Sequence, residues 1–183
     1  LNTAHEEARE AAGALAETRK DAEGKLESVR DAGLPVVPYQ PEVDRIAAES
    51  ARADAILAPD PLGARAIIDR TKTDADALVR RASDVVARLD DGKQVREGLA
   101  KLRAEVADQR RKGLELTEDG GNPDGPSAHA DESLAGLQAA LEAGDPAKAA
   151  ERLAAAQQRL DLGRGVLDAV LKARAGIEKG LPE

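Results

Sequence analysis

The sequence predicts an elongated all-α fold in which two tandem three-helix bundles share one long helix. Aromatic residues make up 1% of the chain, and Phe, Trp, Met and Cys are absent, so a core must be built from Leu, Ile, Val and Ala. Such small side chains favour helices that pack closely along their length. Apolar residues recur three and four positions apart throughout, which indicates amphipathic helices. Part of the pattern also repeats along the chain.

The first helix is expected over residues 3–32. Thr3 provides an N-cap, and Glu6 stands three positions later in a capping-box arrangement. Gly33 supplies a left-handed C-terminal cap, and the Leu34-Pro35 pair ends the helix. The residues expected to face inward are Ala8, Ala11, Leu15, Ala22, Leu26 and Val29.

The segment 34–41 contains three prolines spaced three apart, which favours an extended, polyproline-like connector. One interpretation is a ligand for a proline-recognising domain. The other is a stiff loop in which Val36, Val37 and Tyr39 pack over the end of a bundle. We favour the loop, because the segment lies between two strong helical patterns and has no flanking basic residue.

A second helix is expected over 42–58, and its inward residues are Val43, Ile46, Ser50, Ala53 and Leu57. The long helix follows over 60–116, where Asp60 caps and Pro61 occupies the first helical position. Its length would be about 85 Å at 1.5 Å per residue. The stripe slips in phase near 90–92; its members are Ile68, Thr71, Ala75, Leu78, Ala82, Val85, Leu89, Val95, Leu99, Leu102 and Val106.

The segment 117–126 is rich in glycine, proline and acidic residues and is expected to form a loop. Asn122, Asp124 and Gly125 imitate part of a calcium loop, but Gly120 stands at the first ligand position and a proline interrupts the turn. An EF-hand requires carboxylates in fixed register and a terminal bidentate Glu, so we predict no metal site here.

Two further helices are expected, over 128–143 and over 146–179. The first ends at Gly144, and its inward residues are Ala130, Leu134, Leu137 and Leu141. The second starts at Asp145-Pro146, and its inward residues are Ala149, Leu153, Ala156, Leu160, Gly163, Leu167 and Val170. Gly163 indicates either a close helix crossing or a kink.

An internal repeat indicates two units, residues 1–89 and 90–183. The Asp60-Pro61-x-x-Ala64 pattern recurs 85 residues later, and this offset sets Ala75, Ala82 and Val85 over Leu160, Leu167 and Val170. Upstream the offset is 80, which sets Leu15, Ala22 and Leu26 over Val95, Leu102 and Val106, and Gly33-Leu34 over Gly113-Leu114. The acidic loop absorbs the difference between the two offsets, because loop insertions cost little.

The repeated long-short-long helix pattern resembles spectrin-like tandem repeats, in which the last helix of one unit runs into the first helix of the next. Bacterial proteins of the septation-ring-regulator type are similar. Short motifs also resemble helical regions of large bacterial proteins, some of which carry a TPM domain; they are Asp60-Pro-Leu-Gly-Ala64, Gly113-Leu-Glu-Leu-Thr-Glu-Asp-Gly-Gly-Asn-Pro123 and Ala143-Gly-Asp-Pro-Ala147. The resemblance implies a scaffold or spacer, with a possible location near a membrane, and carries over no catalytic residue.

The charge pattern argues against nucleic acid as a partner. The formal net charge is -8, with 27 basic and 35 acidic residues well mixed along the chain. The one basic cluster, Arg110-Arg111-Lys112, is interpreted as a solvated helix end. No apolar run is long enough to cross a bilayer. Because the chain begins at Leu1, we expect it to be an excised part of a longer protein, which leaves its compartment open.

No catalytic arrangement is recognisable. His5 and His129 are the only histidines, and neither has a carboxylate and a nucleophile arranged beside it in the sequence. A nucleophile elbow, a P-loop, a dinucleotide fingerprint and a zinc-protease motif are all absent. We therefore expect no catalytic, cofactor-binding or metal-binding residue, no cofactor and no enzyme activity.

Two functions remain after these exclusions. The first is a non-catalytic structural scaffold or spacer that holds other domains or protein partners apart. The second is a regulatory binding module whose alanine-rich groove accepts a partner helix. Protein partners are expected in both cases, and self-association is compatible with either.

Overall fold

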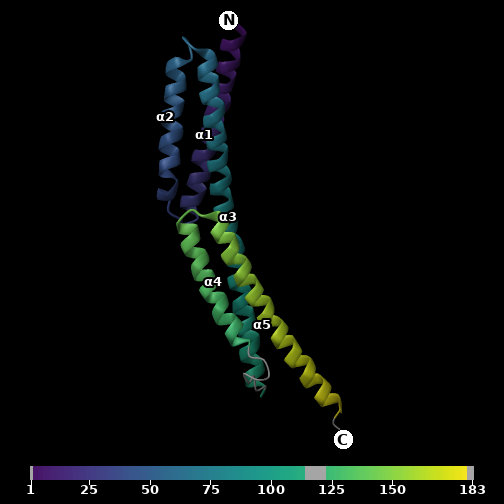
Figure 1. Ribbon diagram of the computed structural model, residues 1–183. Coiled ribbons are helices and arrows are strands. Elements are labelled where there is room, and N and C mark those ends of the chain that lie inside the picture. Colours follow the sequence, from purple (N-terminus) through teal and green to yellow (C-terminus); the bar gives the residue numbers. More distant parts are fainter. Residues whose placement is uncertain (1, 114–122, 181–183) are drawn as a thin grey trace. The chain divides into compact units, whose positions relative to one another are not determined.

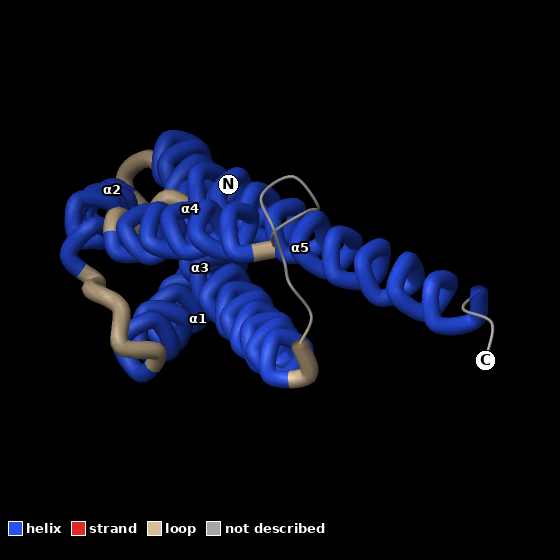
Figure 2. Tube along the Cα trace, turned by 90° about the horizontal axis from the view of Figure 1, so that it is seen from below, coloured by secondary structure: helices blue, strands red, loops and turns tan. Residues whose placement is uncertain are grey.

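The computed structural model describes residues 2–113 and 123–180, and every regular element in these ranges is helical (Figures 1 and 2). The all-α prediction is therefore confirmed. None of the described helices has a stretch that is long and apolar enough to span a bilayer. The elements are α1 (Asn2–Asp31), the 3-10 helix η1 (Val37–Tyr39), α2 (Gln40–Ile56), α3 (Pro61–Arg111), α4 (Asp124–Glu142) and α5 (Pro146–Gly180).

The described chain divides into two compact units. Unit 1 is Leu1–Ala87 together with Leu141–Pro146, so it holds α1, α2, the first part of α3 and the α4–α5 turn. Unit 2 is Arg88–Ala140 together with Ala147–Glu183, so it holds the second part of α3 and most of α4 and α5. The two units therefore draw on one 51-residue helix, α3, whose contour length is about 77 Å at 1.5 Å per residue.

The predicted inward stripes form the cores of both units. All eleven predicted stripe residues of α3, from Ile68 to Val106, are buried. The exceptions are half-buried: Leu26 in α1, Val43 in α2, Leu57 just after α2, and Leu153 and Val170 in α5. Two polar members are satisfied within their own helix, since the Ser50 hydroxyl donates to Ile46 O (2.7 Å) and the Thr71 hydroxyl to Ile67 O (2.8 Å).

The predicted phase slip near residues 90–92 does not interrupt α3. Gly92 is itself buried and fills the stripe between Leu89 and Val95. A Cβ atom added to Gly92 would stand 2.7 Å from Leu137 Cδ2. The stripe thus continues through a position without a side chain, because a neighbouring leucine occupies that space.

Two other glycines of unit 2 also receive a leucine side chain. A Cβ atom at Gly98 would lie 2.7 Å from Leu160 Cδ2, and one at Gly163 would lie 2.8 Å from Leu102 Cδ2. Gly163 therefore marks a close approach of α5 to α3, and α5 remains one helix through it. The close-crossing interpretation is supported over the kink.

Helix ends follow the local chemistry of the sequence. Asp60 caps α3, because its Oδ1 accepts a hydrogen bond from the Gly63 N–H at 2.9 Å. Gly33, Gly113 and Gly144 adopt left-handed backbone conformations just after α1, α3 and α4, with φ values of 79°, 81° and 63°. A residue with a Cβ atom disfavours this conformation, which explains why these three helices stop there.

Several local expectations were wrong. The connector is not extended throughout: η1 forms over Val37–Tyr39, and α2 begins at Gln40. Tyr39 is buried as expected, but Val37 is 75% exposed and does not cover a bundle end. The long helix ends at Arg111 instead of residue 116, where Gly113 stops it, and α4 starts at Asp124 instead of residue 128. These early helix starts are compatible with proline, because the backbone N–H groups of the first helical turn have no partner within the helix and proline, which lacks an N–H, loses nothing there.

Candidate functional site

The two histidines belong to different units, and each contacts a neighbouring group within its own unit. In unit 1, His5 Nε2 lies 3.1 Å from Ala58 O, which joins the start of α1 to the turn that follows α2. In unit 2, the exposed His129 Nδ1 lies 3.2 Å from Glu132 Oε2, one turn further along α4. Neither arrangement contains a nucleophile, so each is consistent with a surface histidine.

The basic cluster at the end of α3 is paired with acidic side chains. Arg110 contacts Asp124 at 2.5 Å, while Arg111 and Lys112 contact Asp108 at 3.5 and 2.6 Å. The Lys112 ammonium lowers the pKa of the Asp108 carboxyl. The Arg110–Asp124 pair joins the end of α3 to the start of α4, whereas the Asp108 pairs are local to the end of α3. Among the described residues, each of these three basic side chains therefore has an acidic partner.

The acidic loop lies largely outside the described residues, and so does its possible calcium ligand Asn122. Of the other candidates, Asp124 begins α4 and pairs with Arg110, and Gly125 follows it within the helix. In the part of the chain that the structure describes, no three His, Asp or Glu side chains gather as a metal ion would require.

One partly buried polar cluster in unit 1 was missed by sequence analysis. The Arg81 guanidinium lies 4.8 Å from the centroid of the Tyr39 ring, donates from Nε to Gly144 O (2.7 Å), and pairs through Nη1 with Glu42 Oε1 (2.5 Å). A Cβ atom at Gly144 would stand 3.1 Å from Tyr39 Cζ, so the α4–α5 turn packs directly on the ring.

Burial determines the electrostatics of this cluster. It raises the pKa of the Tyr39 phenol, while the Arg81 charge lowers it and the Glu42 charge raises it further. The Tyr39 Oη and Glu42 Oε2 atoms are buried and have no hydrogen-bond partner among the described residues. Tyr39 is buried among η1, α2, α3 and the turn, while Arg81 and Glu42 are half-buried at its edge, which suits a structural contact more than a substrate site.

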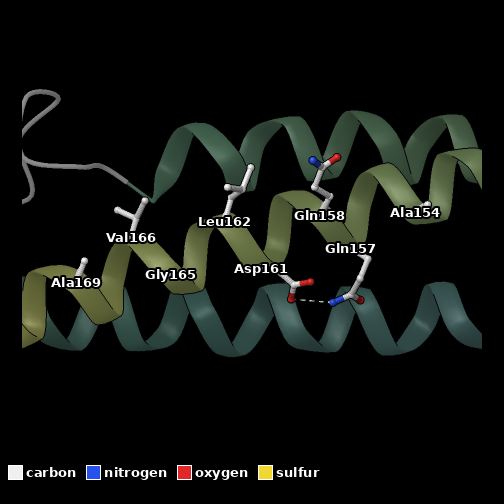
Figure 3. Close-up of a pocket in the computed structure, with 8 residues that line it drawn as sticks. All are labelled: Ala154, Gln157, Gln158, Asp161, Leu162, Gly165, Val166 and Ala169. Atoms are coloured by element: carbon white, nitrogen blue, oxygen red, sulfur yellow. Dashed lines mark hydrogen bonds between the residues drawn. The ribbon is translucent and has the colours of Figure 1, made fainter.

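A second feature, on unit 2, is an exposed and nearly uncharged face of α5 (Figure 3). Leu162 lies near the middle of this face and is 47% exposed. The one charged residue, Asp161, accepts a hydrogen bond from Gln157 Nε2 at 2.9 Å (Figure 3). The α5 face comprises Ala154, Gln157, Gln158, Asp161, Leu162, Gly165, Val166 and Ala169.

The α5 face continues into a groove between α3 and α5. Ala154 and Gln157 line both, and the groove adds Ala150 and Leu153 from α5 and Arg88, Asp91, Gln94 and Val95 from α3. Arg88 Nη1 pairs with Asp91 Oδ2 at 3.2 Å. Apart from this pair, the groove is lined by uncharged side chains.

Unit 1 has a groove at the equivalent place, and charged side chains cover it. It is lined by Glu10, Ala11, Ala14, Arg65, Asp69 and Lys72. Arg65 Nε contacts both Asp69 carboxylate oxygens at 3.0 Å, and Lys72 pairs with Asp76 at 2.9 Å. At the repeat offset of 85, unit 2 has Ala150, Ala154 and Gln157 in place of Arg65, Asp69 and Lys72.

The contrast persists along the helix. Unit 1 has Ala77, Arg80, Arg81 and Asp84 where the α5 face has Leu162, Gly165, Val166 and Ala169. Unit 1 therefore has charged side chains at most of the positions that this sequence offset aligns with the α5 face. Since packing does not require the uncharged side chains of α5, we treat the α5 face as the candidate interaction surface.

No protein-family model, curated protein or solved structure matches this chain significantly. The candidate surface consequently depends on the chain's own geometry. Sequence analysis missed it because the apolar spacing was followed only on the inward side of each helix. A comparison of the outward residues at the repeat offset would have found it.

Proposed function

We propose that this chain is a non-catalytic structural spacer or scaffold built from two tandem, spectrin-like three-helix repeats. The observation that carries the proposal is α3, one helix that supplies core residues to both compact units. A helix shared in this way transmits displacement between units without a flexible linker. Holding attached domains or partners at a set separation is the function that such an arrangement suits best.

The register of the repeat supports the tandem part of the proposal. Pairs at the two offsets are buried in both units at Ala64 and Ala149, at Ala75 and Leu160, and at Leu15 and Val95. Inward residues of α2 and α4 also correspond, at an offset of 84, since Ile46 and Ala53 align with Ala130 and Leu137. Three helices in the same order with the same buried positions are what a duplicated unit would retain.

The composition supports the non-catalytic part. Small aliphatic cores leave little room for a deep pocket with convergent polar groups, which most enzyme sites require. The polar cluster around Tyr39 satisfies Arg81 through Gly144 and Glu42 and is packed over by the α4–α5 turn. Its groups have local packing roles, so they do not need a catalytic explanation.

The spacer proposal is tested by the continuity of α3 in solution. Spin labels at the exposed positions Arg70 and Ala100 lie on one helix in different units. An unbroken helix predicts one narrow distance distribution, centred near about 45 Å at 1.5 Å per residue. The distance between the two labels is measured by pulsed electron–electron double resonance on the full chain.

Asp91→Pro in the same labelled chain should broaden this distribution. Proline removes a helical hydrogen bond and clashes with the preceding turn, at a cost of roughly 3 kcal/mol or more. It should also separate the thermal unfolding of the two units while each stays folded, and Asp91→Ala is the matched control. A broad distribution in the unmodified chain, or a proline variant that still melts in one transition, would contradict a rigid spacer.

A second candidate function, a binding module that accepts a partner helix, is favoured by the α5 face. Its small and uncharged residues extend over several turns, which is the surface that helix-in-groove recognition uses. The two functions are compatible, because a spacer can carry a docking surface on one unit.

A further inference from the structure

We propose that the α5 face binds the same face of a second copy of this chain, with the two α5 helices antiparallel. The proposal goes beyond the spacer function, which a monomer could perform. It depends on the shape of the face, on charges at its ends and rim, and on the contrast with unit 1.

The shape of the face permits close approach of another helix. Ala154, Gly165 and Ala169 have little or no side chain, whereas Leu162 projects from the middle and is 47% exposed. In an antiparallel pair centred near Leu162, the two leucine side chains would meet at the centre of the contact. Their small neighbours would let the two helix backbones approach closely, as the buried Gly163 lets α5 approach Leu102 of α3 inside unit 2.

The charges at the ends of the face select the antiparallel direction. Glu151 lies one turn before Ala154, and Lys172 lies about one turn after Ala169; both are exposed on the same side of α5. They are almost equally far from Leu162 along the helix. An antiparallel pair therefore places Glu151 of each copy beside Lys172 of the other, whereas a parallel pair would place like charges together.

The rim has the same symmetry. Asp161 and the exposed Arg164 lie on one side of the face and close to its centre. In the antiparallel pair, Asp161 of one copy approaches Arg164 of the other. The two Asp161 carboxylates would otherwise be each other's nearest charged groups at the centre, so Arg164 compensates their repulsion.

Unit 1 shows why one unit would pair and the other would not. At the equivalent positions it exposes charged residues such as Asp69 and Arg80, and Arg65 covers the groove beside them. Pairing through that surface would remove ion pairs from water, which is costly. We therefore expect self-association only through unit 2.

The area of the face sets the expected strength. From Glu151 to Lys172 the helix rises about 32 Å at 1.5 Å per residue, and a single helix face of that length buries less than the roughly 800 Å² per partner of a standard interface. Association should therefore be weak, with a dissociation constant of about 1 μM or higher.

The test is sedimentation equilibrium of the full chain over a wide concentration range, with paired charge reversals. Glu151→Lys and Lys172→Glu each place like charges at both ends of an antiparallel pair, so each alone should weaken dimerisation by about tenfold or more. An equimolar mixture of the two single variants should form a heterodimer, and the double variant should dimerise as the unmodified chain does.

Two further variants distinguish dimerisation through the α5 face from a general effect of an added surface charge. Leu162→Lys should abolish dimerisation without changing the helical circular dichroism, because Leu162 is largely exposed. Ala77→Lys, at the equivalent exposed position in unit 1, should leave dimerisation unchanged.

Three results would overturn the proposal. They are a chain that stays monomeric at millimolar concentration, a dimer that Leu162→Lys leaves intact, and single reversals that fail to rescue one another when mixed. A monomeric chain with a narrow Arg70–Ala100 distance would leave the spacer function standing, so the two proposals fail separately.

Discussion

Unit 1 and unit 2 have different side chains at the positions that the proposed repeat aligns. In unit 1, Ala22 of α1 and Leu78 of α3 line one small cavity. At the equivalent positions unit 2 has Leu102 of α3 and Gly163 of α5, and the leucine occupies the space above the glycine. The large and small residues have exchanged helices. The comparison indicates that combined volume at a contact matters more than which helix supplies it.

The surfaces differ more freely than the cores. Where unit 1 has the Arg65–Asp69 and Lys72–Asp76 pairs, unit 2 has Ala150, Ala154, Gln157 and Asp161. Exposed ion pairs contribute little to stability, so the fold does not require either set. The set on α5, which is uncharged apart from Asp161, is therefore the surface to which we assign the proposed partner.

The largest expected effect tests the core of unit 2. Leu160→Ala should lower the free energy of unfolding by about 2–5 kcal/mol, because Leu160 is 2% exposed and fills the space above Gly98. Chemical denaturation followed by circular dichroism measures the change. Alanine is already present at the equivalent Ala75 of unit 1, so a loss below about 0.5 kcal/mol would show that unit 2 tolerates the same small residue.

The second prediction converts one contact of unit 2 to the arrangement in unit 1. Leu102→Ala alone should leave a cavity and lower the free energy of unfolding. Gly163→Leu alone should overfill the contact with Leu102 and lower it by about 1–3 kcal/mol. The double variant recreates the Ala22–Leu78 pattern and should be more stable than Leu102→Ala alone. A double-mutant cycle on unfolding free energies measures the coupling, which we expect to be at least about 1 kcal/mol. Simple additivity would show that the register correspondence does not extend to packing.

The smallest effect concerns the aromatic residue that distinguishes unit 1. The register places Pro123 of unit 2 where unit 1 has Tyr39. Tyr39→Phe keeps the ring beside Arg81 and removes a buried hydroxyl without a partner, so stability at pH 7 should change by less than about 1 kcal/mol.

The stability of the unmodified chain relative to Tyr39→Phe, measured against pH, tests the direction in which the pKa of Tyr39 is shifted. The folded state raises the pKa of Tyr39 above its ordinary value of 10.0, so the unfolded state loses the phenolic proton first. Stability attributable to this group is therefore complete below pH 10 and declines as the pH rises towards the folded-state pKa. Above pH 10 the unmodified chain should lose stability relative to Tyr39→Phe. Parallel curves in urea titrations from pH 8 to 11 would contradict the raised pKa.

Most of the fold could be predicted from the sequence, because amphipathic spacing and glycine caps act locally. The α3 stripe, the Asp60 cap and the stops at Gly33 and Gly144 needed no tertiary information. The phase slip near Gly92 was misjudged because a glycine has no hydrophobic side chain to count. Only the neighbouring Leu137 reveals that the position belongs to the core.

Other errors also came from contacts distant in sequence. The backbone angle of proline suits both an extended chain and the first turn of a helix, so the conformation of residues 34–41 could not be predicted from the prolines alone. The burial of Tyr39 beside Arg81, a residue distant in sequence, accompanies the helical turn. The start of α4 at Asp124 involves a pair with Arg110 across the preceding loop. The α5 face was not predicted because its significance lies in a difference between units.

The shared helix also restricts how the chain can change in length. One residue inserted near Ala87 and Arg88 would turn everything downstream by about 100°, so unit 2 would keep its own core but the α4–α5 turn would lose its contacts with Tyr39 and Arg81. Seven residues complete nearly two turns and would leave an error of only about 20°. Insertions of seven, eleven or eighteen residues should therefore nearly keep the rotation about α3, but each also lengthens the helix by about 1.5 Å per residue and would carry the α4–α5 turn away from Tyr39, so engineered versions of this chain would have to rebuild that contact.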